Sequence, residues 1–161
     1  MRLCIQNIPR RIRTIPHLPS SKSISNRLLM ISALSGNKVH PVNLSESDDT
    51  QTMIRLLRSR DKIKDAGHAG TTMRFLTAYY AIGNQEVILT GTERMKNRPI
   101  GKLVGALQEL GASITYMEKE GYPPLHIIGK KLSGKPIRID SGISSQFISA
   151  LLMTGPCLNG G

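Results

Sequence analysis

The chain has 161 residues, a formal net charge of +11 and only 4% aromatic residues, with no tryptophan. This length suits one domain, and no apolar run approaches the roughly 18 residues that a membrane span needs. The two cysteines, Cys4 and Cys157, lie near opposite ends of the chain without metal-ligand spacing. The composition therefore indicates a globular, cytoplasmic chain with no membrane span, no metal site and no disulfide framework.

The excess of basic residues is most pronounced at the start of the chain. The first 45 residues carry seven Lys or Arg and no carboxylate, since the first acidic residue is Glu46. Such an imbalance is typical of a nucleic-acid arm, a targeting peptide or a site for an anionic small molecule. In residues 1–19, isoleucines are interleaved with arginines, and Pro9, Pro16 and Pro19 would break an amphipathic helix. We predict an edge strand there.

Beyond Pro19, helical and extended patterns alternate without a long linker. In chain order the patterns predict a helix over 23–34, a strand over 39–44, a helix from 48 onwards, a helix over 71–82, a strand over 87–89, a helix over 99–110, strands over 114–117, 125–128 and 136–140, and a helix from 144 onwards. The last helix is apolar almost all round, whereas the strands alternate. This contrast predicts an α/β fold with helices inside and sheet outside.

Three of these helices open with small polar residues: Ser21-Lys22-Ser23, Ala69-Gly70-Thr71 and Ser144-Ser145-Gln146. Helix N-termini have free N–H groups and are natural sites for phosphate or carboxylate. If the fold brings the three starts together, they form an anion pocket surrounded by cations: Lys22, Arg27, Arg74, Arg94, Lys96 and Arg98. Taken singly, each start is equally compatible with an ordinary helix cap and solvated basic side chains, and the glycine-rich start lacks the P-loop pattern.

The order of the motifs is more specific than any one of them. The series is Lys22-Ser23-Ile24-Ser25-Asn26-Arg27, the helix start Ser47-Asp48-Asp49, Gly67-x-Ala69-Gly70-Thr71-x-Met73-Arg74, Leu89-Thr90-Gly91, Arg94-Met95-Lys96-x-Arg98-Pro99-Ile100 and Ser144-Ser145-Gln146-Phe147. From about Leu18 to the last residue, the chain closely resembles the N-terminal part of the EPSP synthases, the 3-phosphoshikimate 1-carboxyvinyltransferases. Members of this family transfer the enolpyruvyl group of phosphoenolpyruvate to the 5-hydroxyl of shikimate 3-phosphate and release phosphate.

The resemblance implies two similar domains, each built from three βαβαββ units with helices inside and sheets outside. Residues 1–19 would then be a leading segment that belongs to the second domain, and 20–161 would be an incomplete N-terminal domain with about two of its three repeat units. The family's acid and base residues lie largely in the second domain. We therefore expect the 161-residue chain to be an N-terminal piece that lacks turnover alone.

The resemblance also implies a role for each matching residue. It assigns shikimate 3-phosphate to Lys22, Ser23, Arg27, Ser144, Ser145 and Gln146. It assigns phosphoenolpyruvate to Lys22, Gly70, Arg98 and Gln146. It implies no cofactor, no metal, no nucleic acid and no membrane partner, and family members are usually monomers, although a piece of one could self-associate.

Two residues depart from the family pattern: His68 stands where most members have Asn, and Phe75 where many have Pro. The sister family, UDP-N-acetylglucosamine enolpyruvyl transferase, typically has Lys-Asn where this chain has Lys22-Ser23. A second class of function, a polyanion-binding module, is suggested by the net charge and by the absence of carboxylates from the first 45 residues. It lacks support from stacking aromatic residues or a nucleic-acid motif.

Overall fold

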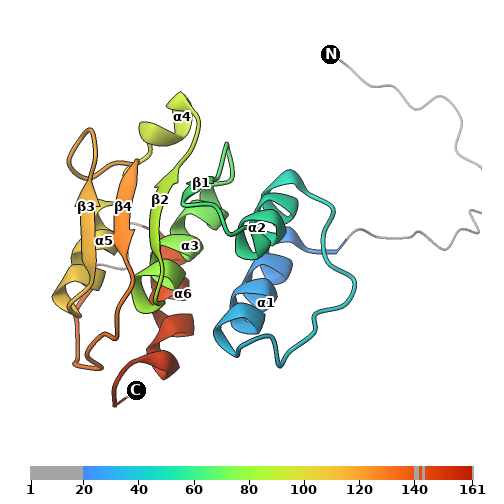
Figure 1. Ribbon diagram of the computed structural model, residues 1–161. Helices are drawn as coiled ribbons and strands as arrows, with labels where there is room; N and C mark the ends of the chain where they lie inside the picture. Colours follow the sequence, from blue (N-terminus) through green and yellow to red (C-terminus); the bar gives the residue numbers. More distant parts are fainter. Residues whose placement is uncertain (1–19, 140–141, 143, 161) are drawn as a thin grey trace, which may run out of the picture.

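The computed structural model describes residues 20–139, 142 and 144–160, so the edge strand expected in 1–19 lies outside the described residues. The elements are α1 (Lys22–Leu34), α2 (Asp48–Arg58), β1 (Ile63–Asp65), α3 (Gly70–Ile82), β2 (Glu86–Thr90), α4 (Glu93–Lys96), α5 (Gly101–Glu109), β3 (Ser113–Tyr116), β4 (Leu125–Ile128), α6 (Ser145–Thr154) and a 3-10 turn, Gly155–Cys157 (Figure 1).

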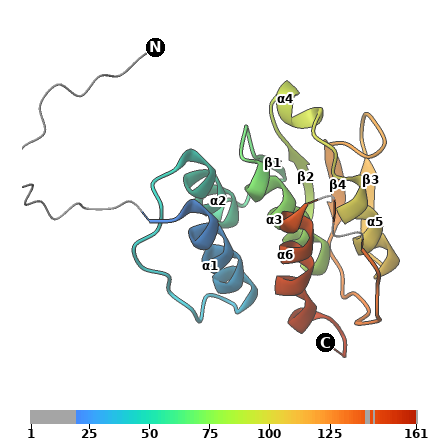
Figure 2. The same cartoon turned by 180° about the vertical axis from the view of Figure 1, so that it is seen from behind.

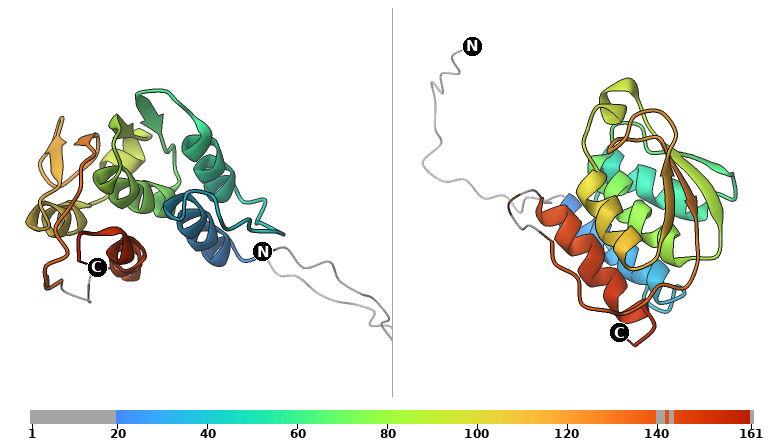
Figure 3. Two further views of the ribbon diagram at one scale, coloured as in Figure 1. Left: turned by 60° about the horizontal axis from the view of Figure 1, so that its bottom comes forward. Right: turned by 90° about the vertical axis from the view of Figure 1, so that its left-hand side faces the viewer.

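The sheet has four strands in the order β1-β2-β4-β3. β1 pairs parallel with β2, and the two remaining pairs are antiparallel. In chain order β1, α3, β2, α5, β3 and β4 make one βαβαββ unit, apart from the short helix α4. α3 and α5 cover one face of the sheet and separate it from α6 (Figure 3). No helix of the described residues lies over the other face, and Ile63 and Ile128 are 61% and 46% exposed. The predicted arrangement, with helices inside and sheet outside, is confirmed.

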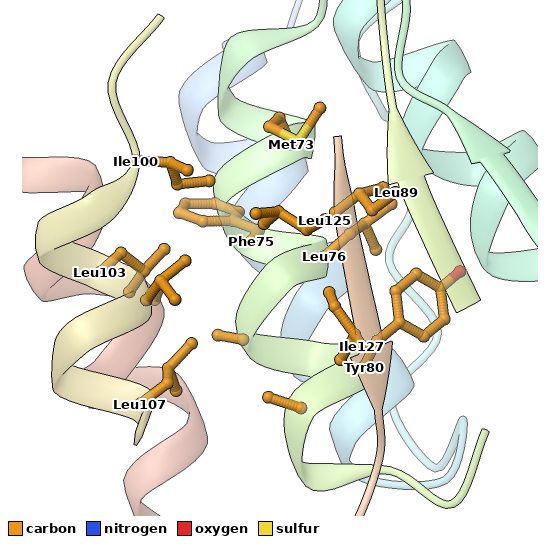
Figure 4. Close-up of a cluster of buried hydrophobic side chains, with 14 of the residues drawn as sticks. Met73, Phe75, Leu76, Tyr80, Leu89, Ile100, Leu103, Leu107, Leu125 and Ile127 are labelled. Atoms are coloured by element: carbon orange, nitrogen blue, oxygen red, sulfur yellow. The ribbon is translucent and has the colours of Figure 1, made fainter. Parts of the chain in front are cut away.

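The core lies between the sheet and α3 and α5 (Figure 4). Phe75 and Leu76 of α3 meet Leu103 of α5 and, from the strands, Leu89 and Leu125, all of them fully buried. Burial of each such side chain contributes about 1.5–3 kcal/mol to folding. This packing holds α3 against the sheet and thereby fixes the position of its first turn.

Two predicted strands are wrong. Residues 39–44 form an irregular loop, because Pro41 cannot donate to a ladder and Asn43 has a φ of 52°. Residues 136–139 form no strand either, and Asp140 lies outside the described residues. Ile137 and Ile139 are instead half-buried against the hydrophobic core. Alternation along the sequence puts these two isoleucines on one face, but it does not supply the partner strand that a ladder requires.

Two elements, the strand β1 and the short helix α4, were not predicted from the sequence. In β1 the burial is the reverse of what hydrophobicity suggests, because Ile63 faces solvent while Lys64 is only 1% exposed. Lys64 Nζ donates to Ser59 O at 2.7 Å and lies 5.7 Å from the centre of the Tyr80 ring. Burial lowers the pKa of Lys64. The second is α4, a helix of only four residues, for which the apolar periodicity gives no signal.

Candidate anion-binding site

The starts of α1, α3 and α6 lie close together at one end of the molecule. The three helices run in the same direction, with their first turns at the same end (Figure 2). Two side-chain hydrogen bonds join them: Gln146 Nε2 donates to Thr71 Oγ1 at 3.2 Å, and Arg27 Nη2 donates to Ser149 Oγ at 2.9 Å. The fold therefore brings the three helix starts together, which was the condition for an anion pocket in the sequence analysis. The positive ends of three helix dipoles point into one region.

The start of α1 presents a cation that is held in place from several sides. Arg27 Nη1 donates to Ser23 Oγ at 2.6 Å and to Ser23 O at 3.0 Å. The Arg27 guanidinium also lies over the ring of Phe75, 5.6 Å from its centre. With Ser149 on its other nitrogen, Arg27 has little rotamer freedom left to lose when it binds a ligand. Phe75, one of the two departures from the family pattern, thus contacts a predicted ligand residue.

The start of α3 is capped by a neighbouring helix. The residue before α3 is Ala69, which has no side-chain acceptor. Asp49 of α2 supplies one instead, since Thr72 N donates to Asp49 Oδ1 at 3.2 Å and Thr72 Oγ1 donates to the same oxygen at 2.7 Å. Lys22 Nζ lies 3.7 Å from Asp49 Oδ2, so Lys22 stands beside the first turn of α3. Asp49 therefore caps a helix other than its own.

Two guanidinium groups meet above Gly70, the first residue of α3. A Cβ built on Gly70 would overlap Arg98 Nη1 and would lie 3.0 Å from Arg74 Nη1. Arg74 Nη1 donates to Gly70 O at 2.9 Å, and its guanidinium lies 5.4 Å from the centre of the Phe147 ring. Burial, and next the charge of Arg98, lower the pKa of Arg74. Two like charges above a bare glycine favour an anion between them.

The start of α6 carries the remaining predicted residues. Ser144 Oγ caps the helix by accepting a hydrogen bond from Gln146 N at 3.2 Å. Ser145 is exposed, whereas Gln146 is half-buried and turns its amide towards α3. Both serine hydroxyls therefore lie at a helix N-terminus, where an anionic group is stabilised by N–H donors and by the dipole.

Two pockets flank the start of α3. One, of about 220 Å³, is lined by His68, Arg94, Met95 and Arg98. The other, of about 450 Å³, lies between the starts of α2 and α3 and is lined by residues that include Lys22, Asp49 and His68. His68 is exposed, and its Nδ1 lies 3.1 Å from Thr92 Oγ1. The hollows and the converging cations thus occupy the same end of the fold.

One predicted cation is occupied elsewhere. Lys96 Nζ lies 2.9 Å from Glu118 Oε1 and 3.2 Å from Glu93 Oε1. These two carboxylates raise the pKa of Lys96, and they balance its charge locally. Arg94, in α4, and Arg98, just after it, therefore remain as the cations of this segment that line a pocket.

The described residues offer no alternative metal centre, because no group of three His, Cys, Asp or Glu side chains among them could hold a metal ion. In the same part of the chain, no helix is long and apolar enough to cross a membrane. The fold and the site therefore define an α/β protein that gathers helix N-termini and cations in one region, an arrangement that suits small anionic ligands.

Comparison with known proteins identifies the family to which the chain belongs. The sequence profile described as EPSP synthase (3-phosphoshikimate 1-carboxyvinyltransferase) matches residues 7–60 and 58–161. A 3-phosphoshikimate 1-carboxyvinyltransferase of Bacteroides fragilis is 52% identical over 153 residues, which are 95% of this chain and 37% of the relative. Its counterpart in a Sulfurovum species is 45% identical over 89% of this chain and 40% of the relative. The chain belongs to the EPSP synthase family.

The likeness extends to the fold. The EPSP synthase from Acinetobacter baumannii aligns with a TM-score of 0.73 over 85% of this chain and 37% of that chain, at 21% sequence identity. The chain spans about 37–42% of the length of the curated relatives that it matches. The predicted fold and family are therefore confirmed, whereas the roles of individual residues remain predictions.

Proposed function

We propose that this chain forms one side of the substrate cleft of an EPSP synthase. The enzyme would transfer the enolpyruvyl group of phosphoenolpyruvate to the 5-hydroxyl of shikimate 3-phosphate, release phosphate, and serve the route to chorismate and the aromatic amino acids. The observation that carries the proposal is the convergence of the starts of α1, α3 and α6 beside Arg98 and Gly70. The family membership supplies the chemistry.

In this proposal shikimate 3-phosphate lies between the starts of α1 and α6. Ser144 and Ser145 bind its phosphate at the N-terminus of α6, where short hydroxyls and N–H groups suit an anion. Ser23 and Arg27 bind it from α1, already joined to each other by a hydrogen bond. The remaining two residues that we assign to this substrate, Lys22 and Gln146, lie on the side of the start of α3.

Phosphoenolpyruvate lies at the start of α3. Gly70, which has no side chain, lets the Arg98 guanidinium lie directly above it, while Lys22 and Gln146 approach from α1 and α6. Two phosphorylated and carboxylated substrates repel each other, and several fixed cations and N–H donors are needed to offset that repulsion. The 5-hydroxyl then adds to the enol double bond as that bond is protonated, and the tetrahedral intermediate eliminates phosphate.

The chain binds both substrates but supplies no acid–base pair of its own in this proposal. Asp49 is the one carboxylate among the described residues that contacts the start of α3, and its Oδ1 already accepts three hydrogen bonds. We assign the acid and base to the second domain, together with residues 1–19, and treat 20–161 as part of the first domain. The enzyme acts in the cytoplasm as a monomer, without metal or organic cofactor.

Isothermal titration calorimetry of the 161-residue chain with shikimate 3-phosphate tests the substrate assignment. Arg27→Gln removes a guanidinium that is bonded to both α1 and α6. Arg60→Gln removes an equal charge from an exposed position. We expect Arg27→Gln to weaken binding about tenfold or more and Arg60→Gln to leave it unchanged. Equal losses in both variants would instead indicate a non-specific polyanion binder, which should also bind mixed oligonucleotides in a salt-dependent way.

A phosphate-release assay with both substrates tests the second part of the proposal. We expect no release above background from the chain alone, because substrate binding without a positioned acid and base gives little catalysis. Turnover at a normal enzyme rate, on the order of 1–1,000 s⁻¹, would refute the assignment of the acid and base to the second domain.

A further inference from the structure

Asp49 lies where α1, α2 and α3 meet beside the candidate site. Its Oδ1 accepts hydrogen bonds from Asn26 Nδ2 at 3.2 Å, from Thr72 N at 3.2 Å and from Thr72 Oγ1 at 2.7 Å. Its Oδ2 lies 3.7 Å from Lys22 Nζ. The Asp49 side chain is only 13% exposed, whereas its neighbour Asp48 is exposed. A single carboxylate therefore joins three helices.

The first turn of α3 takes its cap from this carboxylate. Ala69 provides no side-chain cap for α3. Asp49 accepts from the N–H of Thr72, and in the described part of the chain the N–H groups of Gly70 and Thr71 donate to no protein acceptor. Asp49 thus satisfies the deeper donor of the turn and leaves the two outer donors for a ligand.

Lys22 is kept near these donors by the same carboxylate. The contact of 3.7 Å is long for an ion pair, and the Lys22 side chain is 52% exposed. Such a pair is weak, so its ammonium can leave Asp49 for a bound anion at small cost. Asn26, which is fully buried, fixes the other side of Asp49, and Thr50 Oγ1 donates to Asn26 Oδ1 at 2.7 Å.

We propose that Asp49 is a positioning residue for the phosphoenolpyruvate side of the site. It holds the first turn of α3 against α1 and α2, and it keeps Lys22 beside that turn, so that the ammonium and the free N–H groups of Gly70 and Thr71 meet the same anion. A negative charge in an anion site would otherwise only repel the ligand. This inference rests on the proposed function.

The direction in which Asp49→Asn changes the affinity for phosphoenolpyruvate shows whether Asp49 positions the site or merely repels the ligand. Asp49→Asn keeps the shape and one acceptor but loses the charge, and Asp48→Asn removes an equal charge from the same turn of α2 without those contacts. With saturating shikimate 3-phosphate, we expect Asp49→Asn to raise the Kd for phosphoenolpyruvate about tenfold and Asp48→Asn to leave it unchanged. Tighter binding by Asp49→Asn, or equal effects of the two variants, would overturn the inference. A wild-type chain that binds neither substrate would refute the proposed function instead.

A double-mutant cycle with Lys22→Met excludes a merely structural role for Asp49. If Asp49 acts through Lys22, the tenfold penalty of Asp49→Asn should shrink to less than about threefold in the Lys22→Met background. An undiminished penalty would contradict positioning of Lys22. If Asp49→Asn does not fold, NMR of the wild-type chain tests the same inference. Phosphoenolpyruvate should change the chemical shifts of the Thr72 N–H and the Asn26 side-chain amide, which both donate to Asp49, because Lys22 leaves Asp49 for the ligand. A shift at Gly70 without these two would overturn the inference.

Discussion

Replacing Gly70 by alanine tests whether the start of α3 receives an anion. Gly70 is the first residue of the helix, and its backbone has no left-handed φ, so alanine fits the local conformation. The new methyl group would overlap Arg98 Nη1 and lie 3.3 Å from Arg98 Cζ. Because these atoms are the far end of a flexible side chain, Arg98 can move away, and the fold can accept the change.

The expected magnitude follows from that displacement. Arg98 has to retreat until its guanidinium is about 3.5–4 Å from the new carbon, and the methyl group occupies the space that faces the ligand. Loss of one hydrogen bond from a charged group costs about 1.5–3 kcal/mol, so we expect the Kd for phosphoenolpyruvate to rise about 10-fold to 100-fold. The free energy of unfolding should not fall, since alanine in a helix is favoured over glycine by about 0.5–1 kcal/mol.

Gly105→Ala is the matched control. Gly105 is exposed within α5, and a Cβ there meets nothing within 4 Å. This variant should gain about 0.5–1 kcal/mol in the free energy of unfolding and bind both substrates as the wild type does. Urea unfolding and calorimetry measure the two quantities separately. If Gly70→Ala bound phosphoenolpyruvate within twofold of the wild type, the placement of this anion beside Gly70 and Arg98 would be wrong.

Three further outcomes test the packing and the charge. Tyr80→Phe leaves Leu56 O without the donor now 3.1 Å away and should lower the free energy of unfolding by about 1 kcal/mol at pH 7. Because burial raises the pKa of Tyr80 in the folded state, the stabilisation by its hydroxyl is fully present below about pH 10 and is lost progressively as the pH rises above that value. In urea unfolding, the difference in stability between the wild type and Tyr80→Phe should therefore be smaller at about pH 11 than at pH 7. Gly91→Ala places a Cβ 2.7 Å from Gly67 O and 2.8 Å from Met95 Cγ and should lower the free energy of unfolding by about 1–3 kcal/mol. An unchanged urea midpoint would contradict the close approach of Gly91 to Gly67 and Met95. Raising NaCl from about 50 to 500 mM should weaken shikimate 3-phosphate binding but raise the urea midpoint, because screening relieves the repulsion within a chain of net charge +11.

Local patterns were sufficient for the helices that build the site. Apolar periodicity placed α1, α3 and α6 within one or two residues, and short polar residues marked their starts. The pairing of Ser23 with Arg27 is likewise a contact within one helix, four residues apart. Such features depend on neighbours along the chain, and a sequence displays them directly.

Contacts between distant segments were not predictable in the same way. Asp49 caps Thr72 across 23 positions, and nothing in the residues around either one indicates the pair. Lys64 reads as a surface residue, yet it is buried because a backbone carbonyl and an aromatic ring receive its ammonium. The strand expected over 39–44 failed for a related reason, since alternation describes a face but does not supply a partner strand.

The net charge is distributed in a way that favours the site. Among the described residues, Lys62 and His126 pair with Glu86 on the sheet, and Lys96 pairs with two glutamates. By contrast, Arg27, Arg74 and Arg98 make no ion pair in this part of the chain, and they contact hydroxyls, a carbonyl, aromatic rings or one another. Cations that are held by neutral groups retain their charge for a ligand, at the cost of mutual repulsion in its absence. The starts of α1, α3 and α6 also direct N–H donors at the space beside these cations, so a small anion bound there would relieve the repulsion.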